Sequence, residues 1–280
     1  MSKLIKLPPC QNVGANQTAV IPQVPHGMTY DAVILELGGT AFTKAMLTNI
    51  RNRINGKTFV DITGSHLDTE NQFKKRTANA AYLALHYNDP NARTINGEQI
   101  GAVDTSVGVD TFDFEFEIGG ATAPTLQAFA VVSPPKPVVI NGQPNTNKRT
   151  ISAVMKKVHS LSGAADHSVT IPMGSKLGGA IKRVHFHHGG NVTAIEVRKD
   201  GTYLQETGTN ALVQFMQDEL NRASQANHEA YDPCFTDNQS DAIATLRNDG
   251  SPASFEFTVT TGAGDTVTSY TELYSTIPRL

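Results

Sequence analysis

The feature that most constrains the fold is a strict alternation of apolar and acidic residues at 112–118. The apolar positions are Phe112, Phe114, Phe116 and Ile118, and the acidic positions between them are Asp113, Glu115 and Glu117. Successive side chains of a strand point to opposite faces, so this pattern predicts a strand with one buried and one exposed face. A second alternating run occupies 254–259, and both runs end in glycine-rich turns. The chain is therefore expected to fold into β-sheets that cover a core.

The two alternating runs also indicate an internal duplication. Phe114 and Phe257 are 143 residues apart, and other landmarks recur in the same order at a similar spacing. These are the strand ends at Pro22 and Pro172, the hairpin tips Asn55-Gly56 and Asp200-Gly201, and the pairs Gln72-Phe73 and Gln214-Phe215. Repetition near half of the chain length predicts two copies of one unit. The alternative is one large sandwich whose turns coincide by chance.

Proline-rich sequence marks the boundary between the copies. Four prolines between 134 and 147 exclude a helix and a central strand, so these residues are expected to form an extended linker. The first unit is then 1–133 with an N-terminal arm, and the second is 148–280. Polar segments at 68–80 and 210–227 are predicted helices, and 151–158 is expected to form a short helix. Many short strands with one helix in a long loop favour an eight-stranded jelly roll in each unit, an all-β double jelly roll.

Composition narrows the class of protein without naming a function. The 280 residues carry 23 Lys and Arg against 26 Asp and Glu, a net charge of −3. A near-neutral chain has no general attraction for nucleic acid, and the short basic clusters 74–76 and 182–183 are expected to be solvated surface. Cys10 and Cys234 fit no zinc or redox spacing, which predicts two free thiols. We find no signal peptide and no apolar run long enough to span a bilayer.

The order of these features resembles a known family. A Thr18–Pro22 strand, the Tyr30–Leu37 strand, an Asn-Gly hairpin and a polar helix precede a proline linker and a second copy. The most recognisable string of that copy is Ala194-Ile-Glu-Val-Arg-Lys-Asp-Gly-Thr202. In this layout, nearly the whole chain resembles the double jelly-roll major capsid proteins of tailless, membrane-containing icosahedral double-stranded DNA phages, most closely the corticovirus type.

The resemblance implies a structural protein without enzymatic activity. It implies a homotrimer whose six jelly rolls fill a pseudo-hexagonal site of an icosahedral shell, in contact with neighbouring capsomers. Further partners implied are penton or vertex proteins, minor capsid proteins and an internal lipid membrane beneath the shell, without sequence-specific binding of nucleic acid. The protein would reside in the virion after synthesis and assembly in the host cytoplasm. No cofactor is expected, with structural calcium as the one ion that members of this group can bind.

Histidines at 185, 187 and 188 are the strongest catalytic candidates. His185 and His187 point to one face of a strand and, with Gly179, match the start of a cupin metal motif. The glutamate of that motif should stand at 191 or 192, where Asn191 and Val192 are found. A bicupin-like metal-dependent enzyme is therefore the first rival. The favoured interpretation places these histidines at a surface or interface on a half-exposed strand, where they would make assembly pH-sensitive if they face a subunit boundary.

The acidic face of the 112–118 strand is the second candidate site. Asp113, Glu115 and Glu117 are hard oxygen ligands that suit calcium, and the alternative is a solvated strand face. A paired-carboxylate glycosidase is disfavoured because the chain has no tryptophan to stack against sugars. A viral spike or carbohydrate-binding module remains the second rival. No residue is predicted to be catalytic or to bind a cofactor.

Overall fold

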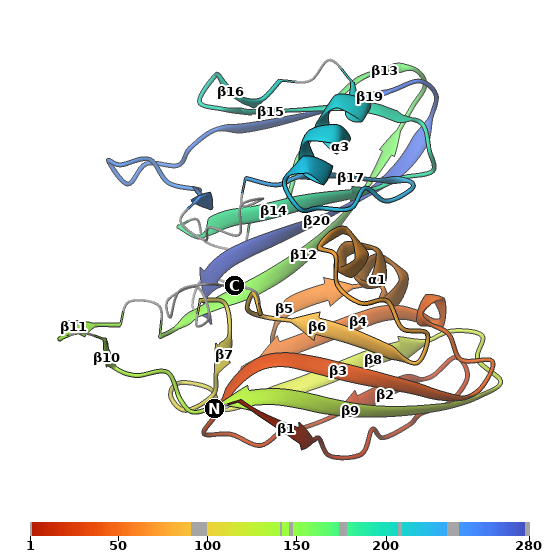
Figure 1. The fold of residues 1–280 in the computed structure, drawn as a ribbon, viewed down its shortest axis with the longest axis vertical. Coiled ribbons are helices and arrows are strands. Elements are labelled where there is room, and N and C mark those ends of the chain that lie inside the picture. The colour runs from red at the N-terminus through yellow and green to blue at the C-terminus, as the bar shows by residue number, and fades with distance from the viewer. Residues whose placement is uncertain are drawn as a thin grey trace.

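The computed structural model describes residues 2–90, 100–140, 142–145, 148–173, 178–206, 209–233 and 241–277. Figure 1 shows two β-sandwiches side by side along the longest axis, one from each half of the chain. Cys10 is a free, half-buried thiol, as predicted, whereas Cys234 lies outside the described residues.

The first half is a sandwich of two sheets whose neighbouring strands run antiparallel. One sheet has the order β1 (Lys3–Lys6), β9 (Ala123–Ser133), β3 (Thr29–Thr40) and β6 (Tyr82–His86), with the short β7 (Val103–Asp104) also paired to β3. The facing strands have the order β2 (Thr18–Ile21), β8 (Phe112–Ile118), β4 (Leu47–Ile54) and β5 (Lys57–Ile62).

The second half repeats this arrangement. One set has the order β12 (Thr150–Leu161), β20 (Asp265–Thr276), β14 (Ala180–His187) and β17 (His228–Tyr231), with the short β18 (Ile243–Ala244) also paired to β14. The other has the order β13 (Ala165–Val169), β19 (Phe255–Thr261), β15 (Val192–Lys199) and β16 (Thr202–Gln205).

The strand order establishes the fold. Leaving aside the short β7 and β18, each half places its first, eighth, third and sixth strands in one sheet, and its second, seventh, fourth and fifth in the other. This is the order of an eight-stranded jelly roll. The predicted pair of tandem jelly rolls is therefore confirmed, and the landmarks at Phe114 and Phe257, at Pro22 and Pro172 and at the two hairpin tips fall on or beside equivalent strands.

One helix follows the fifth strand of each half, and a 3-10 turn, η1 (Lys44–Met46), precedes β4. α1 (Gly64–Phe73) begins earlier than predicted because the Thr63 side chain accepts a hydrogen bond from the His66 N–H, 3.2 Å away. Both helices end sooner than predicted, α1 before Lys75 (φ +53°) and α3 (Asn210–Glu219) before Asn221 (φ +66°), where the backbone turns left-handed. In the described part of the chain, no helix is long and apolar enough to cross a membrane.

The helix expected at 151–158 is wrong. This segment is part of β12, which pairs with β20 along its whole length from Thr150 to Leu161. In this antiparallel pair, every second residue of β12 forms backbone hydrogen bonds with β20. The side chains of Ile151, Ala153 and Val154 are buried in the sheet. A short apolar run of this kind does not distinguish a strand from a helix by its pattern alone.

The linker crosses from one sandwich to the other. It carries the two-residue strands β10 (Val139–Ile140) and β11 (Gln143–Pro144), and its backbone is fixed where the Lys136 N–H donates to Asp104 Oδ2, 3.1 Å away. The two halves also meet directly, because β5 and β12 pair in parallel at Val60 and Val154 and join two sheets into one of nine strands. The exact division at 134–147 stays a prediction.

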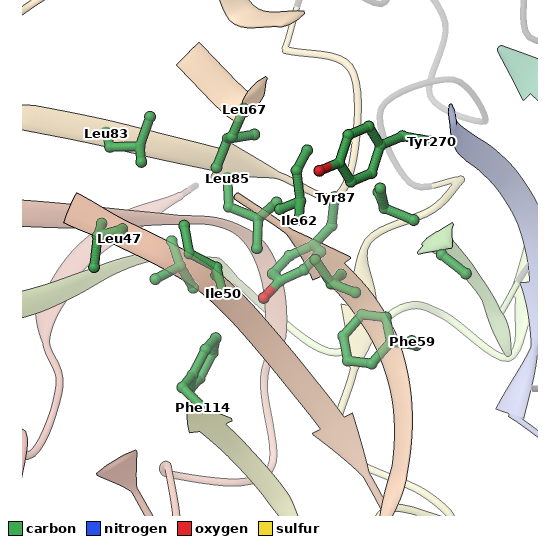
Figure 2. Packing of buried hydrophobic residues seen from close by; sticks show 14 of the residues in the cluster. Leu47, Ile50, Phe59, Ile62, Leu67, Leu83, Leu85, Tyr87, Phe114 and Tyr270 are labelled. Carbon is green, nitrogen blue, oxygen red and sulfur yellow. The ribbon is translucent and has the colours of Figure 1, made fainter. Parts of the chain in front are cut away.

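The predicted alternation defines the core of the first half. The apolar residues of β8 are at most 2 % exposed, and the rings of Phe112 and Phe114 lie 4.9 Å apart. Figure 2 shows Phe114 below Leu47 and Ile50 of β4, with Leu83 and Leu85 of β6 above them. The side chains of both sheets thus interdigitate between the two layers.

We expect Phe114→Ala to lower the free energy of unfolding by about 3–5 kcal/mol, because it removes a buried ring and leaves a cavity. Urea unfolding followed by circular dichroism measures this change. Val158→Ala, at a side chain that is 54 % exposed, serves as the control and should change stability little. A loss below about 1 kcal/mol for Phe114→Ala contradicts the assignment of this ring to the core.

Candidate functional site

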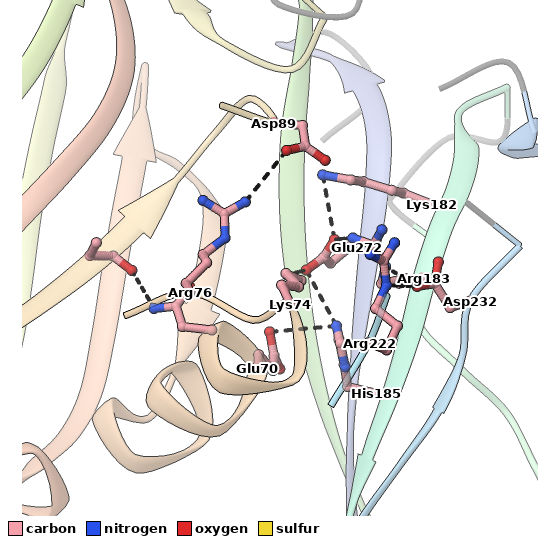
Figure 3. A network of polar contacts seen from close by, with 12 residues as sticks. Glu70, Lys74, Arg76, Asp89, Lys182, Arg183, His185, Arg222, Asp232 and Glu272 are labelled. Carbon is pink, nitrogen blue, oxygen red and sulfur yellow. Dashed lines mark hydrogen bonds and ion pairs between the residues drawn. The ribbon is translucent and has the colours of Figure 1, made fainter. Parts of the chain in front are cut away.

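The most concentrated polar chemistry lies where α1 of the first jelly roll packs against the second. Leu67 and Asn71 face the first half, where Asn71 Nδ2 donates to the Ala84 carbonyl of β6 at 2.7 Å. Glu70, Phe73 and Lys74 face the outer surface of the sheet that contains β14 and β20 (Figure 3). We call this contact the inter-roll seam and define it by α1 together with the residues of β14, β17 and β20 that α1 covers.

Glu272 of β20 is the centre of the charges in the seam. Its carboxylate forms an ion pair with Lys74 of α1 and lies 3.3 Å from Arg183 Nη1 and 3.6 Å from Lys182 Nζ. Burial alone would raise the pKa of Glu272, but these cations and a hydrogen bond with His185 hold it well below its usual range. The carboxylate is therefore charged and fully compensated.

A second buried carboxylate extends the network. Asp232 Oδ2 lies 2.7 Å from Arg183 Nε and 2.8 Å from Arg222 Nε. Burial opposes ionisation, yet the two guanidinium groups lower the pKa of Asp232. Arg183 thus connects Asp232 to Glu272 and fixes β14 relative to its neighbours.

Four histidines line the rest of the seam. The rings of His66 and His187 stack with their centroids 3.9 Å apart, and Phe73 lies edge-on to both His185 and His228. His185 Nδ1 lies 2.9 Å from His228 Nε2. Burial lowers the pKa of His66 and of His187 to about 3 and that of His228 well below its usual value.

The expected placement of His185 and His187 at a surface on an edge or half-exposed strand is wrong, whereas His188 is half-buried. His185 is 0 % and His187 6 % exposed, and they face the first half of the same chain. Lys182 and Arg183, expected to be solvated, are 6 % and 2 % exposed for the same reason. The outer face of β14 looks like a solvent face in the sequence, but α1 covers it.

The seam brings together donors that a metal ion could use. Ligand atoms of Glu70, His185 and Glu272 lie within 4.8 Å of one another, the one such group in the described residues. However, the cations around Glu272 already neutralise its carboxylate, and a divalent ion would be repelled by Lys74, Lys182 and Arg183. The donor set therefore suits an ion-pair network better than a metal centre.

The acidic candidates of β8 lie away from the seam, half-buried on the outer face of the first-half strands of the same nine-stranded sheet. Arg51 of β4 lies 2.7 Å from Glu115 and 2.6 Å from Glu117, and Arg53 forms an ion pair with Glu115. Burial raises the pKa of Asp113 despite the nearby Arg53. The guanidinium groups occupy the carboxylate oxygens that calcium would need.

His188 is half-buried, and its Nδ1 accepts a hydrogen bond from the Gly190 N–H at 3.0 Å.

The acidic and helical members of the seam carry no signal in the sequence. Asp232 and Glu272 are distant in the chain and are joined by Arg183 within the second jelly roll, and Glu70 reaches them only because the first jelly roll packs on the second. A signal was present in β14 instead: Lys182 and Arg183 stand side by side, so in a regular strand one of them would point inward or be covered.

The fold and seam can now be compared with known proteins. The Viral coat protein P2 N-terminal domain matches residues 4–133, and the Viral coat protein P2 C-terminal domain matches residues 151–277. This chain belongs to the viral coat protein P2 family. It is therefore a structural protein of a virus capsid, which is the role that the family resemblance implied. No curated protein sequence matches it.

Solved capsid proteins share the fold of this coat protein. The major capsid protein P2 from Bacteriophage PM2 is 20 % identical and superposes with a TM-score of 0.82, over 99 % of this chain and 98 % of that one. The STIV major capsid protein is 13 % identical with a TM-score of 0.73, covering 99 % and 97 %. A structure of Sulfolobus Turreted Icosahedral Virus is 13 % identical and superposes with a TM-score of 0.69, over 99 % of this chain and 91 % of that one. These proteins share the double jelly-roll fold although their sequence identity to this chain is low.

We expect Glu272→Gln to destabilise the protein by about 3–5 kcal/mol, because the neutral amide leaves Lys74, Lys182 and Arg183 buried without their shared counter-ion. Urea unfolding of the purified protein measures the change. Asp200→Asn is the matched control, since it removes a carboxylate whose partner Arg247 is exposed, and it should be indistinguishable from wild type. Equal behaviour of the two variants would show that the seam carries little stability.

We expect stability to fall as the pH is lowered below about 6.5, the value for an unfolded histidine. The unfolded chain then binds protons that His66, His187 and His228 cannot bind in the fold. Burial raises the pKa of Glu70 and that of Glu229, the latter to about 7, and these two groups act in the opposite direction. From pH 7.5 to 5.5 we expect a net loss of about 1–3 kcal/mol.

Urea unfolding at several pH values tests this dependence. The double variant His187→Gln, His228→Gln should reduce the slope of the profile, because it removes two of the six histidines whose pKa the fold lowers. His167→Gln, on β13 away from the seam, should keep the wild-type profile. A wild-type protein equally stable at pH 5.5 and 7.5 would contradict the assignment of neutral buried histidines.

Proposed function

We propose that this coat protein assembles as a homotrimer that fills a pseudo-hexagonal site of an icosahedral shell, and that it has no enzymatic activity. The observation that carries the proposal is the inter-roll seam between two jelly rolls of one topology. The seam joins different surfaces, a helix of one unit and a sheet of the next. Such a head-to-tail contact, repeated by rotation, closes a ring. Three chains with two units each supply a ring of six.

The character of the seam supports a structural role over catalysis. Glu70, His185 and Glu272 are at most 4 % exposed, so a substrate cannot reach the cluster that most resembles an active site. The ion pairs connect α1 to β14 and β20 and thus hold the two jelly rolls in one relative position. A subunit of a regular lattice needs this rigidity. No cofactor is part of the proposal, and structural calcium at Asp113, Glu115 and Glu117 stays a prediction that the arginine contacts of Glu115 and Glu117 disfavour.

The remaining partners follow from the family. We propose that the trimer contacts neighbouring capsomers, penton or vertex proteins and minor capsid proteins, and that the shell encloses a lipid membrane. Assembly would take place in the host cytoplasm. The net charge of −3 supports a shell protein that makes no sequence-specific contact with nucleic acid.

Size-exclusion chromatography with light scattering tests the proposal. We expect a particle of about three times the chain mass of 30.1 kDa, with a hexagonal outline in negative-stain images. Metal analysis after dialysis addresses the bicupin-like rival. A persistent monomer at high concentration, or stoichiometric iron, manganese or zinc lost on replacing His185 and His187, would overturn the proposal.

A further inference from the structure

The helices of the two jelly rolls are anchored in the same way. Asn71 of α1 donates to the Ala84 carbonyl of β6, and Gln217 of α3 donates to the Ala230 carbonyl of β17, both at 2.7 Å. The two donors are 146 residues apart in the chain, and so are the two acceptors. The helices are therefore equivalent at this offset, and the sequence pairing of Phe73 with Phe215 is wrong by four residues, about one helical turn.

This offset identifies the outer face of α3. The residues of α1 that enter the seam include His66 and Glu70, and their equivalents in α3 are Leu212 and Met216. Phe215 lies on the same face. The exposed fractions of Leu212, Phe215 and Met216 are 61 %, 63 % and 41 %. The face that α1 buries against the second jelly roll thus carries three uncovered apolar side chains in α3, with the exposed Glu219 at the place of Phe73.

The strand registers identify the equivalent sheet surface of the first jelly roll. β14 pairs His185 with Ala230 of β17 and with Tyr270 of β20. β3 pairs Ile34 with Ala84 of β6 and with Phe129 of β9. Ile34 and Phe129 therefore take the places of His185 and Tyr270. By the same pairing Glu36 takes the place of His187, and Tyr82 that of His228.

This equivalent surface forms a groove instead of a covered seam. Ile34, Phe129 and Tyr82 line a hollow of about 680 Å³ together with Leu4 of β1. Leu4 is 65 % and Tyr82 45 % exposed. Glu36 of β3 and, from α1 and the residues after it, Asp68, Lys75 and Arg76 also line the groove. The sheet side of the groove is therefore more apolar than the equivalent surface of the second jelly roll, where histidines and charges face α1.

We propose that α3 of one chain packs into this groove on the first jelly roll of a second copy, so that the contact between subunits repeats the inter-roll seam with apolar residues. The inference rests on the proposed trimer and specifies the surfaces that form it. Each chain offers one α3 and one groove, so the contact is heterologous and closes when the third chain meets the first. Leu212 and Met216 then lie against Glu36, Ile34 and Phe129.

The edge strands support the same arrangement. Within the chain, β5 of the first unit meets β12 of the second in parallel at Val60 and Val154. The equivalent strands are β16 and β1, which end their sheets. Tyr203 and Leu204 of β16 are 39 % and 38 % exposed. A neighbouring copy whose α3 fills the groove also brings β16 beside β1, which would cover both edges.

Disruption of the outer face of α3 tests the proposal. Phe215→Asp with Met216→Asp should convert the trimer to a monomer at micromolar concentration, because two carboxylates replace the apolar contact. Both side chains are exposed in the chain, so the circular dichroism spectrum should stay that of the folded protein. The melting temperature should fall to a value that no longer depends on protein concentration, because association stops contributing to stability. Val107→Asp, at a loop residue that is 49 % exposed, is the matched control and should remain trimeric.

Cross-linking gives a positive test of the same contact. Met216→Cys and Ile34→Cys, introduced together with Cys10→Ser and Cys234→Ser, occupy the places of Glu70 and His185, which are in contact in the seam. A short bis-maleimide, whose two electrophilic groups each add one cysteine thiol, should yield dimer and trimer bands that end at the trimer. Met216→Cys paired with Val107→Cys should yield none.

The outcomes separate this inference from the proposed function. A trimeric wild type whose folded Phe215→Asp, Met216→Asp variant is still a trimer, without cross-links at Met216→Cys and Ile34→Cys, overturns the inference and leaves the trimer standing. A monomeric wild type overturns both. A trimer that the α3 variant dissociates and the cysteine pair captures supports the assigned contact.

Discussion

The neutralisation of one buried carboxylate holds the two halves of this coat protein together. The Glu272 carboxylate forms ion pairs with Lys74 of the first jelly roll and with Lys182 and Arg183 of the second. Each of these side chains is largely removed from water where the halves meet. Removing such charges from water is costly unless every one is paired, so the network tolerates only one relative position of α1 and β14. A hydrophobic contact of the same area would permit sliding. The seam therefore contributes geometric definition more than net stability.

The same duplicated unit carries two different surfaces at equivalent positions. His185, Tyr270 and His228 in the second jelly roll correspond to Ile34, Phe129 and Tyr82 in the first, and Glu70 in α1 corresponds to Met216 in α3. The helix anchor to the sixth strand is unchanged in both halves. Divergence is thus concentrated on the outer faces, where neighbours are recognised, while the strand order and the cores are retained.

This division explains how much the sequence could predict. The cores obey local rules: alternation in β8 and the turn glycines at 56 and 201 depend on residues near one another in the chain, so the strands, the duplication and the fold class followed from the sequence. The seam depends on contacts such as Lys74 with Glu272, 198 residues apart, which no local pattern encodes. For that reason β14 was expected to be half-exposed. Its adjacent Lys182 and Arg183 both reach Glu272 because the register of β14 shifts between Ile181 and Arg183, which no local pattern predicted.

The distribution of polar and apolar contacts also follows from how each is formed. The seam joins two units of one chain, where covalent connection supplies a high effective concentration, so a contact with little net affinity can still form. The contact between chains has no such help and must offset the loss of translational and rotational freedom. Burial of Leu212, Phe215 and Met216 supplies a driving force that does not depend on matching charges. An ionic seam inside the subunit and an apolar one between subunits is therefore the arrangement in which folding defines the geometry and association completes the ring.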